Sequence, residues 1–147
     1  MADKFRGRIE IGGTLSGEDL SRFRKAAGVN EKNFKQHIEE RHFVMDDNER
    51  PLGEYPLLEN LCRDLELPYI RQSDGMYDYS PEYVFWTPAQ DEIKSIVLDH
   101  SGEMQTPMHV LRSIRESFQN ENFDEVAELF DRHIIDLPEL PPFKLRG

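Results

Sequence analysis

Two hydrophobic periodicities alternate along this chain, and their mixture constrains the fold more than any single motif does. Residues Gly7 to Ile11 alternate charged residues with isoleucines, which is the period of a strand with one buried face. Between Pro56 and Pro68, leucines and Cys62 follow the helical i, i+3, i+4, i+7 spacing. The chain has 147 residues, the size of one ordinary domain. It therefore predicts a single α+β domain.

The same signals predict an element order of β-α-α-β-α-β-β-β-α-α, with a small antiparallel or mixed sheet packed on helices. Helices are expected over residues 16–27, 30–41, 56–65, 106–118 and 122–134. Strands are expected over residues 7–11 and 42–45, followed by a meander drawn from residues 67–72, 76–79, 83–87 and 93–99. We expect residues 1–136 to form the domain and residues 137–147 to form an extended, Pro-rich C-terminal tail.

Charge is the most unusual feature of the composition. The chain carries 18 Lys and Arg residues against 29 Asp and Glu residues, a net charge of −11. The first 45 residues have a net charge of +2 and the remaining residues one of −13. Because nucleic-acid affinity comes mostly from clustered Lys and Arg, this balance disfavours a nucleic-acid binder. It favours a partner protein with a basic surface.

Targeting signals and cysteine usage indicate the compartment. No window contains the roughly 18 consecutive apolar residues of a membrane span, and the N-terminal residues lack the apolar segment of a signal peptide. The single cysteine, Cys62, cannot form an intramolecular disulfide. We therefore expect a cytoplasmic protein that makes no membrane contact.

Two segments resemble binding motifs superficially. The glycine-rich turn Gly12 to Gly17 precedes a predicted helix, but Glu18 and Asp19 stand where a phosphate loop needs Lys and Ser or Thr. His37 and His42 lie five residues apart, about 140° around a helix, and so diverge where metal ligands should converge. The sequence predicts no cofactor and no metal site.

A turn after one predicted strand offers a weak candidate for catalysis. His100 could serve as a base, and Asp99 or Glu103 could orient it. No readable motif supplies a nucleophile, since the chain lacks G-x-S-x-G and Cys62 lies on an apolar helix face. These residues support an alternative hypothesis, a small hydrolase or transferase.

Five aromatic residues occur within ten positions, at Tyr77, Tyr79, Tyr83, Phe85 and Trp86. No Lys or Arg is interleaved among them, so stacking on single-stranded nucleic acid is disfavoured. One interpretation places Phe85 and Trp86 in the core with the tyrosines at its rim. The other interpretation makes the tyrosines a partner- or ligand-binding surface and the interface of a homodimer, formed at an uncovered strand edge.

The leading hypothesis from these features is a small acidic protein-interaction module: an accessory, adaptor or inhibitory subunit that binds a more basic partner. Besides the enzyme alternative, a second alternative is a ligand-binding sensor that uses the tyrosine-rich strands. The tail, with its P-x-x-P spacing from Pro138 to Pro141, is expected to pack against the domain or to serve as a recognition element.

Overall fold

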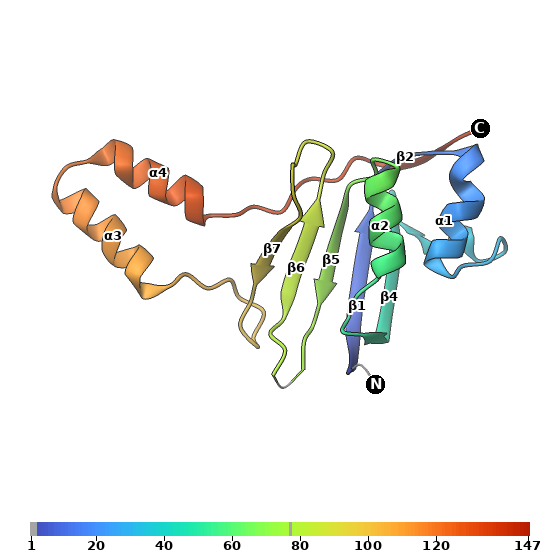
Figure 1. The fold of residues 1–147 in the computed structure, drawn as a ribbon, viewed down its shortest axis with the longest axis horizontal. Coiled ribbons are helices and arrows are strands. Elements are labelled where there is room, and N and C mark those ends of the chain that lie inside the picture. Colours follow the sequence, from blue (N-terminus) through green and yellow to red (C-terminus); the bar gives the residue numbers. More distant parts are fainter. Residues whose placement is uncertain (1–2, 77) are drawn as a thin grey trace.

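The computed structural model describes residues 3–76 and 78–147 and shows an α+β fold built on a six-stranded antiparallel sheet (Figure 1). The strand order is β3-β4-β1-β5-β6-β7. Its strands are β1 (Lys4–Ile11), β3 (Ile38–Glu39), β4 (His42–Pro51), β5 (Tyr69–Ser73), β6 (Glu82–Trp86) and β7 (Lys94–Val97). The predicted fold class is therefore confirmed, with the antiparallel form of the sheet.

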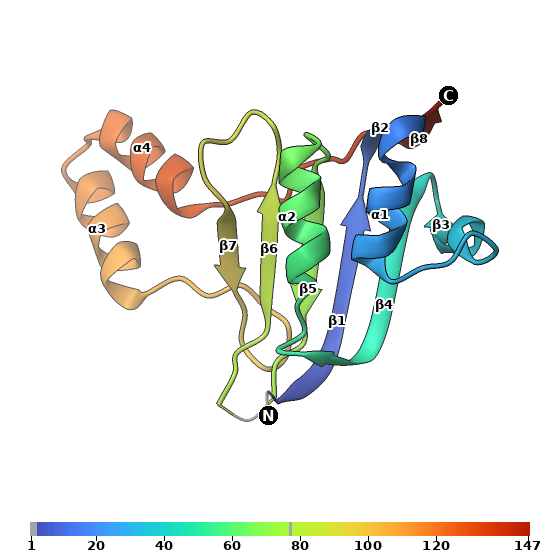
Figure 2. The ribbon, with the colours of Figure 1, turned by 45° about the vertical axis from the view of Figure 1, so that its right-hand side comes forward.

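Two helices cover one face of the sheet (Figure 2). The first, α1 (Leu20–Ala27), follows a short 3-10 turn at Gly17–Asp19 and ends at Gly28, whose left-handed φ of 71° closes the helix. The second, α2 (Pro56–Asp64), begins with proline in its first turn, as the sequence predicts. Their apolar stripes face the sheet and bury the main core.

The main core is rich in aromatic rings. Phe43, on β4, is fully buried, and its ring lies 4.9 Å from that of Phe23 on α1 and 5.7 Å from that of Phe143 in the tail. Tyr55 and Tyr69 are also buried, and the Tyr55 hydroxyl donates a 2.6 Å hydrogen bond to the Gly7 carbonyl. Three segments that are distant in sequence thus meet at one cluster.

A buried ion pair joins α2 to the sheet beside this core. Arg71 on β5 donates from Nε to Glu59 on α2 over 2.9 Å, and only 5 and 7% of the two residues' surfaces are exposed. The second carboxylate oxygen of Glu59 accepts from the Tyr55 backbone amide at 2.9 Å. Arg71 also donates to the Ser73 hydroxyl, which in turn donates to the Gly53 carbonyl at 2.8 Å. Every group in this network has a partner, as burial of charge requires.

Cys62 lies on the buried face of α2 and is fully inaccessible, which confirms its predicted place in the core. Burial raises the pKa of its thiol, so the reactive thiolate is scarce at neutral pH.

We expect the Cys62 thiol of the native protein to resist a thiol reagent for hours and to react within minutes in urea. Rapid modification of the folded protein, followed by absorbance, would show that this part of the core opens readily.

The C-terminal tail runs back toward α1 (Figure 1). Leu137 packs against the small cluster of Phe85, Ile96 and Leu98 on β6, β7 and the turn that follows. Further along, Leu140 is buried, and β8 (Phe143–Arg146) pairs in parallel with β2 (Gly13–Ser16). The tail therefore lies extended against the domain and adds a strand, which the sequence did not indicate.

Helices α3 (Met108–Gln119) and α4 (Phe123–His133) form an antiparallel hairpin beyond β7, at the opposite end of the molecule from α1 (Figures 1 and 2). We call this hairpin the arm. The Asn122 side chain accepts a hydrogen bond from the Glu125 amide and caps α4 as predicted. Among the described residues, no helix has the length and apolar character needed to cross a membrane.

The predicted helix over residues 30–41 is wrong. This segment forms turns, a short 3-10 helix at Phe34–His37 and the two-residue strand β3. The Asn30 side chain accepts from the Asn33 amide and closes a local turn in place of a helix cap. Glu40 and Arg41 have positive φ angles of 46 and 76°, which reverse the chain between β3 and β4.

The predicted meander and its flanking strands also need correction. Within the predicted strand over residues 76–79, the described residues Met76 and Tyr79 make only an isolated bridge, in the long connection between β5 and β6. The polar residues 46–51, expected as a loop, continue β4 and pair with the first half of β1. Pairing with a neighbouring strand stabilises this polar segment although its side chains are largely exposed.

Candidate interaction surface

Strand β7 is the last strand of the sheet, and within the described residues no further strand pairs with the outer side of Lys94–Val97. Just beyond β7 the chain folds back along this side: Met104 forms an isolated antiparallel bridge with Leu98, and the Asp99 amide donates to the Glu103 carbonyl at 2.9 Å. The Leu98 amide donates to the Pro81 carbonyl at 2.8 Å, just beyond the pairing of Val97 with Glu82. Because hydrogen-bonded and non-hydrogen-bonded pairs alternate in an antiparallel ladder, Lys94 and Ile96 also bond to β6. The amides and carbonyls of Ser95 and Val97 therefore point away from the sheet.

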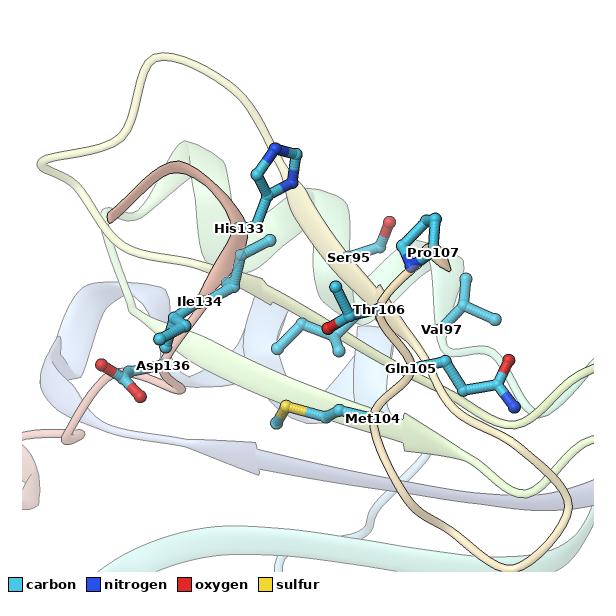
Figure 3. Close-up of a pocket in the computed structure, with 11 residues that line it drawn as sticks. Ser95, Val97, Met104, Gln105, Thr106, Pro107, His133, Ile134 and Asp136 are labelled. Carbon is cyan, nitrogen blue, oxygen red and sulfur yellow. The ribbon is translucent and has the colours of Figure 1, made fainter. Parts of the chain in front are cut away.

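These outward groups face a cavity of about 790 Å³, which we call the edge cavity (Figure 3). It lies between the two chain segments that connect the arm to the sheet. Its walls are formed by Ser95, Ile96, Val97, Met104, Gln105, Thr106, Pro107, His133, Ile134, Ile135 and Asp136. Val97, Met104 and Ile134 are each more than half exposed. The edge cavity thus combines open strand backbone with apolar side chains and one carboxylate.

The arm exposes a second apolar surface. Inside the hairpin, Val110 is buried, and Ile114, Val126 and Leu129 are half-buried. A further set of large apolar residues points outward, with exposed fractions of 43 to 61%: Met108, Leu111, Phe118, Phe123 and Phe130. We call these five residues the arm face. The Phe118 and Phe123 rings meet edge to face at 5.7 Å, so the exposed residues of the two helices join at the tip.

The predicted tyrosine surface is divided in the structure. Tyr77 lies outside the described residues. Tyr79 is 42% exposed and its ring lies 5.6 Å from that of Phe5, at the rim of a cavity of about 310 Å³ that Ser73 and Glu82 also line. Tyr83, half-buried, packs against the Phe85 cluster. The structure does not bring Tyr79 and Tyr83 together into one patch, and their role in partner binding stays a prediction.

The strand-edge premise of that tyrosine interface is wrong. Strand β5 pairs with both β1 and β6, and β6 pairs with both β5 and β7. The hairpin that carries the tyrosines is therefore inside the sheet, whose end strands are β7 and the two-residue β3. Pairing order depends on contacts between distant residues, so the sequence alone did not reveal which strand ends the sheet.

The candidate catalytic residues lie on the exposed turn after β7. The Asp99 carboxylate accepts from the Ser101 hydroxyl at 2.6 Å and from the Ser101 and Glu103 amides at 2.9 and 3.0 Å. These hydrogen bonds, the Ser101 hydroxyl first, lower the pKa of Asp99 and commit its carboxylate to the turn. His100 and Glu103 are exposed, and neither lines the edge cavity. This geometry gives the enzyme alternative no support.

The histidines of the rejected metal motif make backbone contacts instead. His37 Nδ1 lies 3.0 Å from the Val44 carbonyl, and His42 Nε2 lies 3.1 Å from the Leu140 carbonyl. His42 thus helps to hold the tail against β4. Both rings have a structural use in the fold.

Comparisons of the chain with protein-family models, with curated proteins and with solved structures found no significant match. Sequence reasoning identified the α3–α4 hairpin but not its exposed face, although the seven-residue spacing of Leu111 with Phe118, and of Phe123 with Phe130, is visible in the sequence.

Proposed function

We propose that this chain is a small cytoplasmic protein-interaction module, an accessory, adaptor or inhibitory subunit, and that it binds an extended, basic segment of a partner protein at the β7 edge. The outward-facing amide and carbonyl of Ser95 and the outward-facing Val97 amide, beside the edge cavity, are the observation that carries the proposal. An added strand would form main-chain hydrogen bonds with both groups of Ser95 and with the Val97 amide. Adding a strand would also complete an edge that is otherwise free to recruit other chains.

The side chains around the edge cavity indicate the composition of such a segment. Met104, Val97 and Ile134 offer apolar contacts to alternate side chains of a bound strand. Asp136 places a carboxylate in the cavity wall, and the turn that follows β7 carries the exposed Glu103. Together with the net charge of −11, these groups favour a segment that combines β-branched residues with Lys or Arg.

Substitution of Ser95 by proline separates backbone from side-chain effects. The Ser95 amide does not bond to β6, so proline removes an outward donor while the β6–β7 hydrogen bonds remain. Ser95→Ala is the matched control, because it changes the side chain and keeps the amide. We expect that selection from a displayed library of random decapeptides yields binders enriched in Lys and Arg. The wild type and the Ser95→Ala variant should bind these peptides with at least ten times higher affinity than the Ser95→Pro variant does.

Salt provides a second measurement on the same peptides. Their association rate with the wild type should fall several-fold between 50 and 500 mM salt, because screening weakens attraction to the acidic surface. Binders without basic residues, equal binding to the proline variant, or an association rate independent of salt would each contradict the proposal.

A further inference from the structure

The arm face has a regular spacing that suits a helical bundle. Leu111 and Phe118 on α3 lie seven residues apart, as do Phe123 and Phe130 on α4. A seven-residue repeat keeps apolar side chains on one side of a helix and is the spacing used between helices that cross at about 20°. Two helices can bury only one stripe each between them. The arm uses Val110, with the half-buried residues beside it, for that purpose and leaves the arm face exposed.

The charges beside the arm face differ between its two sides. On α3, Arg115 and Arg112 lie about 40 and 100° around the helix from Leu111, on the side away from Ile114, which contacts the interior of the hairpin. They form a mainly basic border along the outer side of α3, and the exposed Glu116 lies about 40° further around the helix than Arg112. Both arginines are exposed, and the ion pairs recorded for the described residues do not involve either of them.

The outer side of α4 carries the opposite charge. Asp124 and Asp131 directly follow Phe123 and Phe130 and so lie about 100° around the helix, on the side away from Leu129. Both aspartates are exposed. The arm face therefore has arginines along one border and aspartates along the other.

We propose that the arm face binds the arm face of a second copy of this chain, and that the two hairpins form an antiparallel four-helix bundle.

The border charges favour one of the two possible orientations of the twofold axis. If the twofold axis runs parallel to the helices, α3 of each subunit packs against α4 of the other, and each Arg border meets an Asp border. If the axis runs across the helices, α3 meets α3 and arginine faces arginine. Charge complementarity selects the first arrangement, which closes as a symmetric dimer.

The size of the arm face is adequate for such a dimer. Burying the exposed parts of three phenylalanines, one leucine and one methionine removes on the order of 500 Å² from water per subunit. The four border side chains add to this area. The sum is close to the roughly 600 Å² per subunit found at the lower end of specific interfaces. This interface is separate from the edge cavity, so a dimer can present two β7 edges.

Sedimentation at 5 to 100 µM tests the proposal directly. The wild type should sediment as a dimer of 17.3 kDa subunits, with monomer appearing on dilution. Phe118→Ser combined with Phe130→Ser should leave a folded monomer with an unchanged far-ultraviolet spectrum, because both side chains are exposed. The same pair of serine substitutions at Tyr79 and Tyr83 should leave the dimer intact. A monomeric wild type, or a dimer unaffected at positions 118 and 130, would overturn the proposal.

Charge reversal tests the arrangement of the helices. Reversing Arg112 and Arg115 to glutamate should weaken self-association at least tenfold, and reversing Asp124 and Asp131 to arginine should do the same. When the two reversed chains are mixed, the Glu border of one chain meets the introduced Arg border of the other. The native Arg border then meets the native Asp border, so a mixed dimer should form. Failure of the mixture to associate would overturn the arrangement, as would a dimer that tolerates either reversal alone.

Discussion

Replacing Arg71 by methionine is expected to lower the free energy of unfolding by about 3–5 kcal/mol. The substitution leaves the Glu59 carboxylate buried with the Tyr55 amide as its remaining hydrogen-bond donor. A buried charge without its counter-ion is costly, because the protein interior solvates it far less well than water does. The same change also removes the donor to the Ser73 hydroxyl. Since small domains are stable by only about 5–15 kcal/mol, much of the native stability would be lost.

Urea unfolding, followed through Trp86 fluorescence at a fixed protein concentration, measures this effect. A second substitution, Glu59→Gln, removes the unpaired charge and retains an oxygen for the Tyr55 amide, so the double variant should be more stable than Arg71→Met alone. Arg132→Met is the matched control. The Arg132–Glu128 pair lies on the surface of α4 at 2.6 Å with side chains 59 and 66% exposed, and its loss should cost less than about 0.5 kcal/mol. Equal losses in the two methionine variants would show that burial of the Arg71 pair has no energetic consequence.

Elements whose signals are local were predictable from the sequence. The start of α2 at Pro56, the Asn122 cap of α4 and the Gly28 end of α1 each depend on residues within one helical turn. The buried position of Cys62 follows from the same short-range spacing. In these places, local preference and tertiary structure agree.

Elements that depend on distant partners were not predictable. Strand β8 pairs with β2, and the two lie about 130 residues apart in the chain, so no window of sequence contains both. The polar half of β4 is a strand because β1 pairs with it, although its own residues resemble a loop. The segment from residue 30 to 41 contains only two apolar residues at helical spacing, Phe34 and Ile38, and tertiary contacts of Phe34 determined its structure instead.

The candidate surfaces also combine features with local sequence signals and features that depend on distant partners. The arm helices were predicted, but the sequence does not show that the arm lies beyond β7 with one face uncovered. The open edge depends on the pairing order of the whole sheet, which placed the tyrosine-bearing hairpin inside and β7 outside. The seven-residue spacing on both arm helices and the opposite charges beside it were the available clue, because these features describe a helix surface and need no knowledge of pairing.

The second large effect is expected at the aromatic cluster that joins the tail to the rest of the core. The Phe43 ring contacts those of Phe23, Phe34 and Phe143, at centroid distances of 4.9, 5.5 and 5.7 Å. Phe43→Ala should reduce the free energy of unfolding by about 3–5 kcal/mol, because it removes a fully buried ring and leaves a cavity among aromatic groups that cannot collapse without losing their own contacts.

The substitution should also loosen the C-terminal tail, an effect separate from the loss in the free energy of unfolding. Phe143 is the first residue of β8, and its amide donates to the Arg41 carbonyl at 2.7 Å, just before β4 begins. With the Phe43 ring gone, Phe143 loses one of its packing partners, so the amides of β8 should exchange with solvent faster than those of β5 in hydrogen-exchange measurements. Leu57→Ala, at a site 72% exposed on α2, is the matched control and should change stability by less than about 0.5 kcal/mol. If Phe43→Ala lowers stability but β8 and β5 exchange in parallel, the tail is held by its β2 pairing and its His42 contact, and the aromatic cluster does not anchor it.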